Sequence, residues 1–117
     1  KLVNDRFGHE TGDDVLCTVV KLTNDNIRST DFHGRWGGEE FMVLLPQTTL
    51  EAALDVAEKL RLAVAGHQFS HVGTVTASYG VAELAPQENA RSLAQRVDEA
   101  LYRAKDRGRN RVEVYEA

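Results

Sequence analysis

The chain is organised around the segment Arg35-Trp36-Gly37-Gly38-Glu39-Glu40-Phe41, which is followed directly by Met42-Val43-Leu44-Leu45. Two consecutive glycines allow positive φ angles and a close approach of the backbone to a ligand. The apolar run after them is typical of a buried strand, and the residues from Phe32 to Trp36 indicate a strand before them. The segment therefore predicts a β-hairpin whose turn carries two glycines and two carboxylates.

The two acids of this turn, Glu39 and Glu40, have chemistry of their own. Their oxygens are hard ligands of the kind that Mg²⁺ prefers, and a carboxylate can also act as a general base. A glycine turn that presents acids to solvent is equally a common surface feature without chemistry. The turn alone does not separate these interpretations, and the rest of the chain has to decide.

Length and composition describe one ordinary globular domain. The chain has 117 residues, 42% of them hydrophobic and 27% charged, and we expect residues 1–117 to form a single domain. The net charge of −4 argues against nonspecific nucleic-acid binding, which needs a basic surface. The single cysteine, Cys17, cannot form an internal disulfide, and we expect a buried helical thiol. No membrane span or signal peptide is recognisable, which favours a cytoplasmic setting.

Hydrophobic periodicity predicts the elements before and around the hairpin. Apolar residues at spacings of three and four indicate a helix from Asp13 to about Ser29, with Asp13 and Asp14 in its first turn. The hairpin strands are expected at Phe32–Trp36 and Phe41–Leu45. The apolar stripe of the helix consists of Val15, Leu16, Val19, Val20 and Ile27.

The second half continues with two more helices and two strands. The predicted order is a helix from Thr49 to Ala65, a strand from Thr74 to Val81, a helix that begins near Asn89 or Ser92 and ends at Arg107-Gly108, and a final strand with Val112 and Val114. Helices and strands in this order indicate an α+β fold with the helices packed against a sheet.

Basic and polar residues outside the hairpin offer possible ligand contacts. Lys105 and Arg109 stand four residues apart across Gly108, so that their side chains can converge on one anion. The same residues commonly complement a helix C-terminus. Asn4 and Asp13 can read a purine edge, or they can serve as turn or N-cap residues.

The combination of motifs resembles a known family. Gly37-Gly38-Glu39-Glu40-Phe41 is similar to the signature of the GGDEF family of diguanylate cyclases, in its Glu-Glu variant. The resemblance extends over nearly the whole chain. The further matching motifs are Lys1-Leu2-Val3-Asn4-Asp5, Gly8-His9, Gly12-Asp13, Arg28-x-x-Asp31 with Arg35, Thr76-x-Ser78-x-Gly80-Val81, and Ala100-Leu101-Tyr102-x-Ala104-Lys105-x-x-Gly108-Arg109-Asn110.

The resemblance implies a fold and an activity. The fold is a palm-like antiparallel central sheet flanked by helices, as in nucleotidyl cyclases. The activity is the condensation of two GTP molecules into cyclic di-GMP with release of two pyrophosphates. Each subunit of a homodimer binds one GTP, and the two facing subunits form the active site, with Mg²⁺ or Mn²⁺ as the cofactor.

The resemblance also implies roles for individual residues. Glu39 is expected to bind metal, and Glu40 to help hold metal or to accept a proton. Phosphate contacts are expected from Lys1, Lys105 and Arg109, and Lys1 is counted with the catalytic residues.

The remaining implied contacts concern the guanine base and the triphosphate backbone. Asn4 and Asp13 resemble the guanine-reading pair of the family, with the carboxylate accepting from the N1–H and N2–H₂ edge. Gly37 and Gly38 are expected to let the backbone approach the triphosphate.

A second site is implied by Arg28-Ser29-Thr30-Asp31. This Arg-x-x-Asp sequence resembles the allosteric site of the family, which binds the product cyclic di-GMP as an inhibitor. A local ion pair between Arg28 and Asp31 at a helix end is the structural alternative.

One departure concerns the start of the chain. The family places a metal-binding aspartate on its first central strand, a few residues before the position of Lys1. We therefore expect a domain without its N-terminal helix and first central strand, inactive as a fragment, and preceded in the full-length protein by a sensory or receiver domain. No nucleic-acid partner is expected. The alternatives are a catalytically silent receptor for GTP or cyclic di-GMP, and a scaffold that only dimerises.

Overall fold

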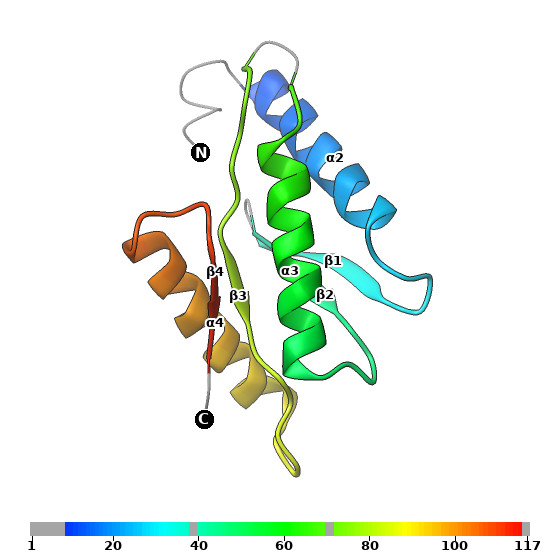
Figure 1. The fold of residues 1–117 in the computed structure, drawn as a ribbon, viewed down its shortest axis with the longest axis vertical. Coiled ribbons are helices and arrows are strands. Elements are labelled where there is room, and N and C mark those ends of the chain that lie inside the picture. Colours follow the sequence, from blue (N-terminus) through cyan, green and yellow to red (C-terminus); the bar gives the residue numbers. More distant parts are fainter. Residues whose placement is uncertain (1–8, 38–39, 70–71, 116–117) are drawn as a thin grey trace.

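The computed structural model describes residues 9–37, 40–69 and 72–115 (Figure 1). Its elements follow the predicted order of helix, hairpin, helix, strand, helix and strand. Their bounds are α2 His9–Asp25, β1 Phe32–Gly37, β2 Glu40–Leu44, α3 Leu50–Ala65, β3 Tyr79–Val81, α4 Ala90–Asp106 and β4 Val112–Val114. The α+β class is confirmed.

The strands pair as two separate two-stranded sheets within the described residues. β1 and β2 form the predicted antiparallel hairpin, with Phe32 opposite Leu44 and an irregularity between Arg35 and Gly37. β3 and β4 pair in parallel, with Tyr79 opposite Val112. The expectation that the first central strand is missing concerns a position before Lys1, and it stays a prediction.

Helix α2 differs from its prediction at both ends. It begins at His9 instead of Asp13, so that Asp13 and Asp14 lie beyond the first turn. It ends at Asp25, before Ile27, because the Asn26 side chain donates to the carbonyl oxygen of Leu22 at 2.7 Å. The local bond satisfies a carbonyl that the next helical turn would otherwise use.

The prediction that Cys17 is buried is wrong, because its side chain is exposed. Val15, on the same helix, is buried against Val64 and Phe69, with Val19 packed beside them. A residue two positions after Val15 is rotated by roughly 200° around the helix and therefore faces solvent. Among the helices of the described ranges, none is long and apolar enough to cross a membrane.

Helices α3 and α4 begin where their capping residues predict. The Thr49 hydroxyl accepts from the Ala52 N–H at 3.2 Å, and the Asn89 side chain accepts from the Ser92 N–H at 2.8 Å. The oxygens of Thr49 and Asn89 satisfy N–H groups that lack a partner inside the helix. At the other end of α3, Gly66 ends the helix, with its N–H bonded to the carbonyl oxygen of Leu62.

The predicted strand from Thr74 to Val81 is shorter in the structure, where only Tyr79–Val81 is a strand. The predicted inward face is nevertheless correct, since Val75 and Ala77 pack against the core cluster. Alternation alone indicates which side chains turn inward, whereas a strand also needs a neighbour for its backbone hydrogen bonds.

Strand β3 lies between α3 and α4. A Cβ added at Gly80 would come within 2.4 Å of the Leu101 N atom of α4, so only glycine allows this approach. The neighbouring Tyr79 lies close enough to Arg61 of α3 to interact with its charge. Burial raises the pKa of Tyr79 to about 12. Through Gly80, the middle of α4 packs directly against β3.

Candidate active site

The hairpin turn is the centre of the candidate site. β1 ends at Gly37 and β2 begins at Glu40, so the described backbone reaches the turn from both sides. The predicted site residues Lys1, Asn4, Gly38 and Glu39 lie outside the described residues. The geometry below therefore concerns Glu40 and the residues that other elements bring to it.

Glu40 meets the end of helix α4. The Lys105 Nζ atom donates to the Glu40 Oε2 atom at 3.0 Å, and both side chains are about two-fifths exposed, at 39% and 41%. Sixty-five residues separate the two in sequence. Two of the predicted site residues are thus brought together by the fold, one from the glycine turn and one from the last turn of α4.

The turn after α4 carries Arg109 in an unusual backbone conformation. Gly108, Arg109 and Asn110 follow one another with φ angles of 117°, 64° and 46°. Left-handed backbone costs an ordinary residue about 1 kcal/mol, so two such residues in a row need support from their surroundings. One support is local, since the Arg109 N–H donates to the carbonyl oxygen of Ala104 at 2.9 Å.

The arginines on either side of Arg109 are ion-paired. Arg107 Nη1 lies 2.9 Å from Glu113 Oε1, and Arg111 Nε lies 2.9 Å from Glu113 Oε2. The Arg109 side chain is exposed and has no hydrogen-bond or ion-pair partner within the described ranges. Of these three arginines, Arg109 is therefore the one available to an anionic ligand.

Asp13 lies on α2 with an exposed side chain. No hydrogen bond or ion pair joins it to Glu40 or Lys105 in the part of the chain that the structure describes. Its predicted contact with guanine stays a prediction. As an exposed carboxylate on the first half of the helix, it is open to a ligand.

The donor chemistry of the turn partly fits a divalent metal ion. The Glu40 carboxylate is half exposed and has the hard oxygens that Mg²⁺ or Mn²⁺ prefers. Across residues 9–37, 40–69 and 72–115, however, no three His, Cys, Asp or Glu side chains gather into a metal site. Glu39 lies outside the described residues, so its part in a metal site stays a prediction.

The Arg28–Asp31 pair forms a second cluster at the opposite end of β1. Arg28 Nη2 donates to Asp31 Oδ1 at 3.0 Å, and the Arg28 N–H donates to Asp31 Oδ2 at 2.8 Å. The structural alternative, a local ion pair, is therefore present. Six strand residues, roughly 17–20 Å, separate this pair from the glycine turn.

Arg28 also holds the loop between β2 and α3. Its Nη2 atom donates to the Pro46 carbonyl oxygen at 3.1 Å and to the Thr48 Oγ1 atom at 2.9 Å. Hydrogen bonds from Arg28 hold the pKa of Asp31 below its ordinary value. The Asp31 carboxyl is 2% exposed, whereas the Arg28 side chain is 58% exposed. The arginine thus keeps a face toward solvent while it joins two loops.

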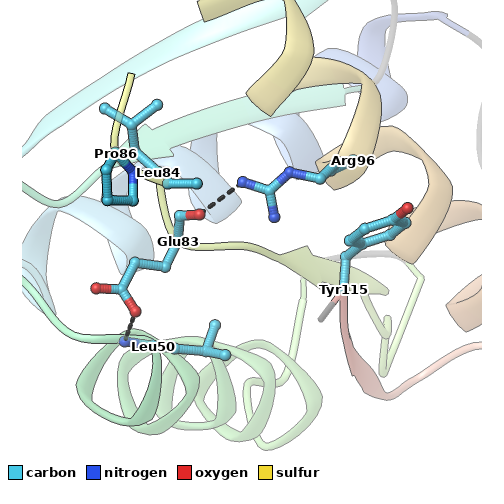
Figure 2. Close-up of a pocket in the computed structure, with 7 residues that line it drawn as sticks. Leu50, Glu83, Leu84, Pro86, Arg96 and Tyr115 are labelled. Atoms are coloured by element: carbon cyan, nitrogen blue, oxygen red, sulfur yellow. Dashed lines mark hydrogen bonds between the residues drawn. The ribbon is translucent and has the colours of Figure 1, made fainter. Parts of the chain in front are cut away.

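A separate apolar pocket of about 340 Å³ lies beside the start of α3 (Figure 2). Its polar groups are already used: Arg96 Nη2 donates to the Glu83 carbonyl oxygen, and the Glu83 carboxylate accepts from the Leu50 N–H. Arg96 is also ion-paired with Glu88 and lies over the Tyr115 ring at 5.5 Å. We assign this pocket no ligand.

Sequence reasoning missed several partners of the site residues. Thr48 and Pro46 contact Arg28, and Arg61 of α3 contacts Asn110 beside Arg109. The spacing of Glu58 and Arg61 indicates an i,i+3 ion pair, which the structure contains. No sequence signal points from Arg61 to Asn110, which lies 49 residues away.

Comparison with known proteins is consistent with this arrangement. The family described as diguanylate cyclase, GGDEF domain, matches residues 1–111. Diguanylate cyclase DgcM of Escherichia coli K12 is 47% identical over 112 residues, which are 96% of this chain and 27% of DgcM. The chain thus spans about a quarter of that relative's length.

Two solved structures have the same fold. The active GGEEF domain of a diguanylate cyclase from Vibrio cholerae matches with a TM-score of 0.92 and 39% identity, covering 99% of this chain and 76% of that one. The GGDEF domain of DgcB from Caulobacter crescentus, in complex with c-di-GMP, matches with a TM-score of 0.92 and 34% identity, covering 97% and 70%.

Proposed function

The chain belongs to the GGDEF family of diguanylate cyclases, and from this premise we propose that its protein condenses two GTP molecules into cyclic di-GMP and two pyrophosphates. The observation that carries the proposal is the contact between Glu40 and Lys105 at 3.0 Å. It joins an acid of the glycine turn to a base at the end of α4. Both belong to motifs of the family.

The residues divide the work by charge. Lys105 and Arg109, whose side chain has no partner among the described residues, bind phosphate oxygens, the lysine as a point charge and the arginine bidentately. Asp13 and Asn4 hydrogen-bond the guanine edge. Lys1 adds a further phosphate contact, and the glycine backbone at Gly37 and Gly38 allows the triphosphate to approach. Lys105 exchanges its contact with Glu40 for one with phosphate when GTP enters.

Glu39 and Glu40 hold the divalent cation, with the remaining ligands from outside the described residues. Mg²⁺ or Mn²⁺ held there would polarise the phosphate and lower the pKa of the attacking 3′-hydroxyl. Glu40 helps to hold the ion or accepts the proton of that hydroxyl. Its half-exposed carboxylate suits either role.

The reaction needs two copies of the domain. Each copy holds one GTP, so the attacking hydroxyl and the α-phosphate belong to nucleotides on facing subunits of a homodimer. Arg28 and Asp31 bind the product cyclic di-GMP and inhibit the enzyme. A sensory or receiver domain elsewhere in the full-length protein brings the subunits together.

Radiolabelled GTP with Mg²⁺, added to the full-length protein that contains this domain, tests the proposal. Formation of cyclic di-GMP is the expected result. Binding of GTP or of cyclic di-GMP without turnover would show that the domain is a receptor and not an enzyme. If neither binding nor turnover were found, and light scattering showed a dimer, the domain would be a scaffold that only dimerises.

A further inference from the structure

The left-handed turn that carries Arg109 is held from outside by helix α3. Arg61 Nη1 donates to the Asn110 Oδ1 atom at 3.0 Å and to the Asn110 carbonyl oxygen at 3.5 Å. Asn110 has a φ of 46°, and Arg109 immediately before it has a φ of 64°. Both the side chain and the backbone of Asn110 are thus tied to Arg61.

Arg61 is itself fixed in place. Its Nε atom donates to Glu58 Oε1 at 3.0 Å and to Glu58 Oε2 at 3.1 Å, and the two residues form an ion pair one helical turn apart. The Arg61 side chain is only 19% exposed, so little freedom is left to it. A rigid donor on a regular helix is a suitable anchor for a strained turn.

On the other side, Glu113 holds the ends of the same turn. Its carboxylate is 11% exposed and pairs with both Arg107 and Arg111. The turn is thus anchored at Arg107, Asn110 and Arg111, whereas the Arg109 side chain between them has no partner among the described residues. Every anchor acts on a neighbour of Arg109 and leaves its guanidinium open to solvent.

We propose that Arg61 is a positioning residue, which through Asn110 holds the left-handed turn and so orients Arg109 toward the phosphates of GTP. The inference rests on the proposed function, because it needs Arg109 to bind phosphate. Arg61 does not touch the nucleotide itself. Its removal lets the turn relax, and the Arg109 guanidinium then has to be ordered when GTP binds.

A double-mutant cycle in the full-length protein tests this coupling. The variants are Arg61→Met, Arg109→Ala and the combination, and the measurements are the Kd of GTP with Mg²⁺ by calorimetry, KM, kcat and Tm. We expect Arg109→Ala to weaken GTP binding about tenfold. Arg61→Met should weaken it about threefold alone and have no effect when Arg109 is already alanine.

Arg96→Met is the matched control for lost stability. Like Arg61, Arg96 is a mostly buried arginine in an ion pair with a glutamate, but it lies away from the turn. We expect it to lower Tm and to leave the Kd of GTP unchanged. If it weakened GTP binding as much as Arg61→Met, the effect would be general destabilisation and the positioning role would be wrong.

Two substitutions of Asn110 provide a second test should Arg61→Met fail to fold. Asn110→Gly keeps the left-handed backbone but loses the side-chain acceptor, and Asn110→Asp keeps an acceptor for Arg61. We expect the glycine variant to bind GTP more weakly than wild type, and the aspartate variant to keep an affinity close to that of wild type. Equal affinities of the two variants would overturn the inference.

The cycle also separates the proposed phosphate contact of Arg109 from the proposed positioning role of Arg61. If Arg109→Ala left GTP binding unchanged, Arg109 would have no phosphate role and the positioning would fail with it. If Arg109→Ala weakened binding but Arg61→Met weakened it equally in both backgrounds, only the positioning role would be overturned.

Discussion

The two arginine clusters of this domain use their charge in opposite ways. At the α2–β1 corner, the Arg28 guanidinium is bound by the domain itself, through Asp31, Pro46 and Thr48. At the turn after α4, Arg107 and Arg111 are ion-paired, and Arg109 between them has no side-chain partner in the described ranges.

The difference separates two kinds of binding site. A ligand at Arg109 meets a guanidinium that no described residue contacts, whereas a ligand at Arg28 competes with contacts that already join two loops. Removing an arginine with several partners also leaves those partners unsatisfied, which lowers stability. We therefore expect substitutions near the glycine turn to affect catalysis, and substitutions at Arg28 to affect product binding and stability together.

The largest effect is expected at the glycine turn itself. Glu39→Gln keeps the size of the side chain and removes the charge that we propose to hold the divalent ion. Turnover of GTP in the full-length protein should fall by orders of magnitude, since metal catalysis lowers the barrier by several kcal/mol. Tm should barely change. Near wild-type product formation would remove Glu39 from the mechanism.

Arg28→Ala should act on product instead of turnover. We expect cyclic di-GMP binding to weaken by about 1.5–3 kcal/mol, which is tenfold or more, with relief of product inhibition and an unchanged initial rate. Tm should fall, because Pro46 and Thr48 lose their donor. Calorimetric titration of cyclic di-GMP measures the change.

Thr48→Val is the matched control for this corner. It removes one contact of Arg28 and leaves the Arg28–Asp31 pair in place. We expect a lower Tm with no loss of product affinity. Should Arg28→Ala and wild type bind cyclic di-GMP equally, the pair is only the structural ion pair.

Lys105→Met should give a smaller effect, confined to substrate. Its ion pair with Glu40 is exposed and contributes on the order of 1 kcal/mol or less to stability, so Tm should change little. The KM for GTP should rise about fivefold to tenfold, because a charge-assisted contact to phosphate is lost. Arg91→Met, at the other end of α4, is the control, and a KM change of the same size there would indicate a general charge effect.

The smallest effect concerns acid stability. Hydrogen bonds, first from Arg96 and then from the Ala85 N–H and Ser92, lower the pKa of Glu88 to about 2. The folded pKa lies below the ordinary value of 4.5, so the stabilisation is present above that value and is lost as the pH falls toward 2. Asp31 contributes with the same sign.

Thermal unfolding between pH 6 and about pH 2 compares the two carboxyls. Glu88→Gln should flatten the loss of Tm at low pH, and Asp31→Asn should do so to a smaller extent. A larger effect of Asp31→Asn would show that the α2–β1 corner, and not the Glu88–Arg96 pair, dominates acid unfolding.

Sequence reasoning predicted the elements well because their signals are local. Capping at Thr49 and Asn89 and the glycine turn of the hairpin depend on residues a few positions apart. The same reasoning wrongly predicted that Cys17 is buried, because burial depends on which elements pack against the helix. It also overestimated the length of the strand from Thr74, because a strand needs a neighbour for its backbone hydrogen bonds.

The order of helices and strands, the α+β class and the family could all be predicted from the sequence, since periodicity and motifs depend on residues close together along the chain. The ion pairs and hydrogen bonds between charged residues far apart in the sequence could be seen only in the folded chain. Glu40 meets Lys105 across 65 residues, and Arg61 meets Asn110 across 49. Such contacts follow from how α3 and α4 pack around β3. This packing brings together residues that are far apart in the sequence, so the spacing of neighbouring residues cannot predict it.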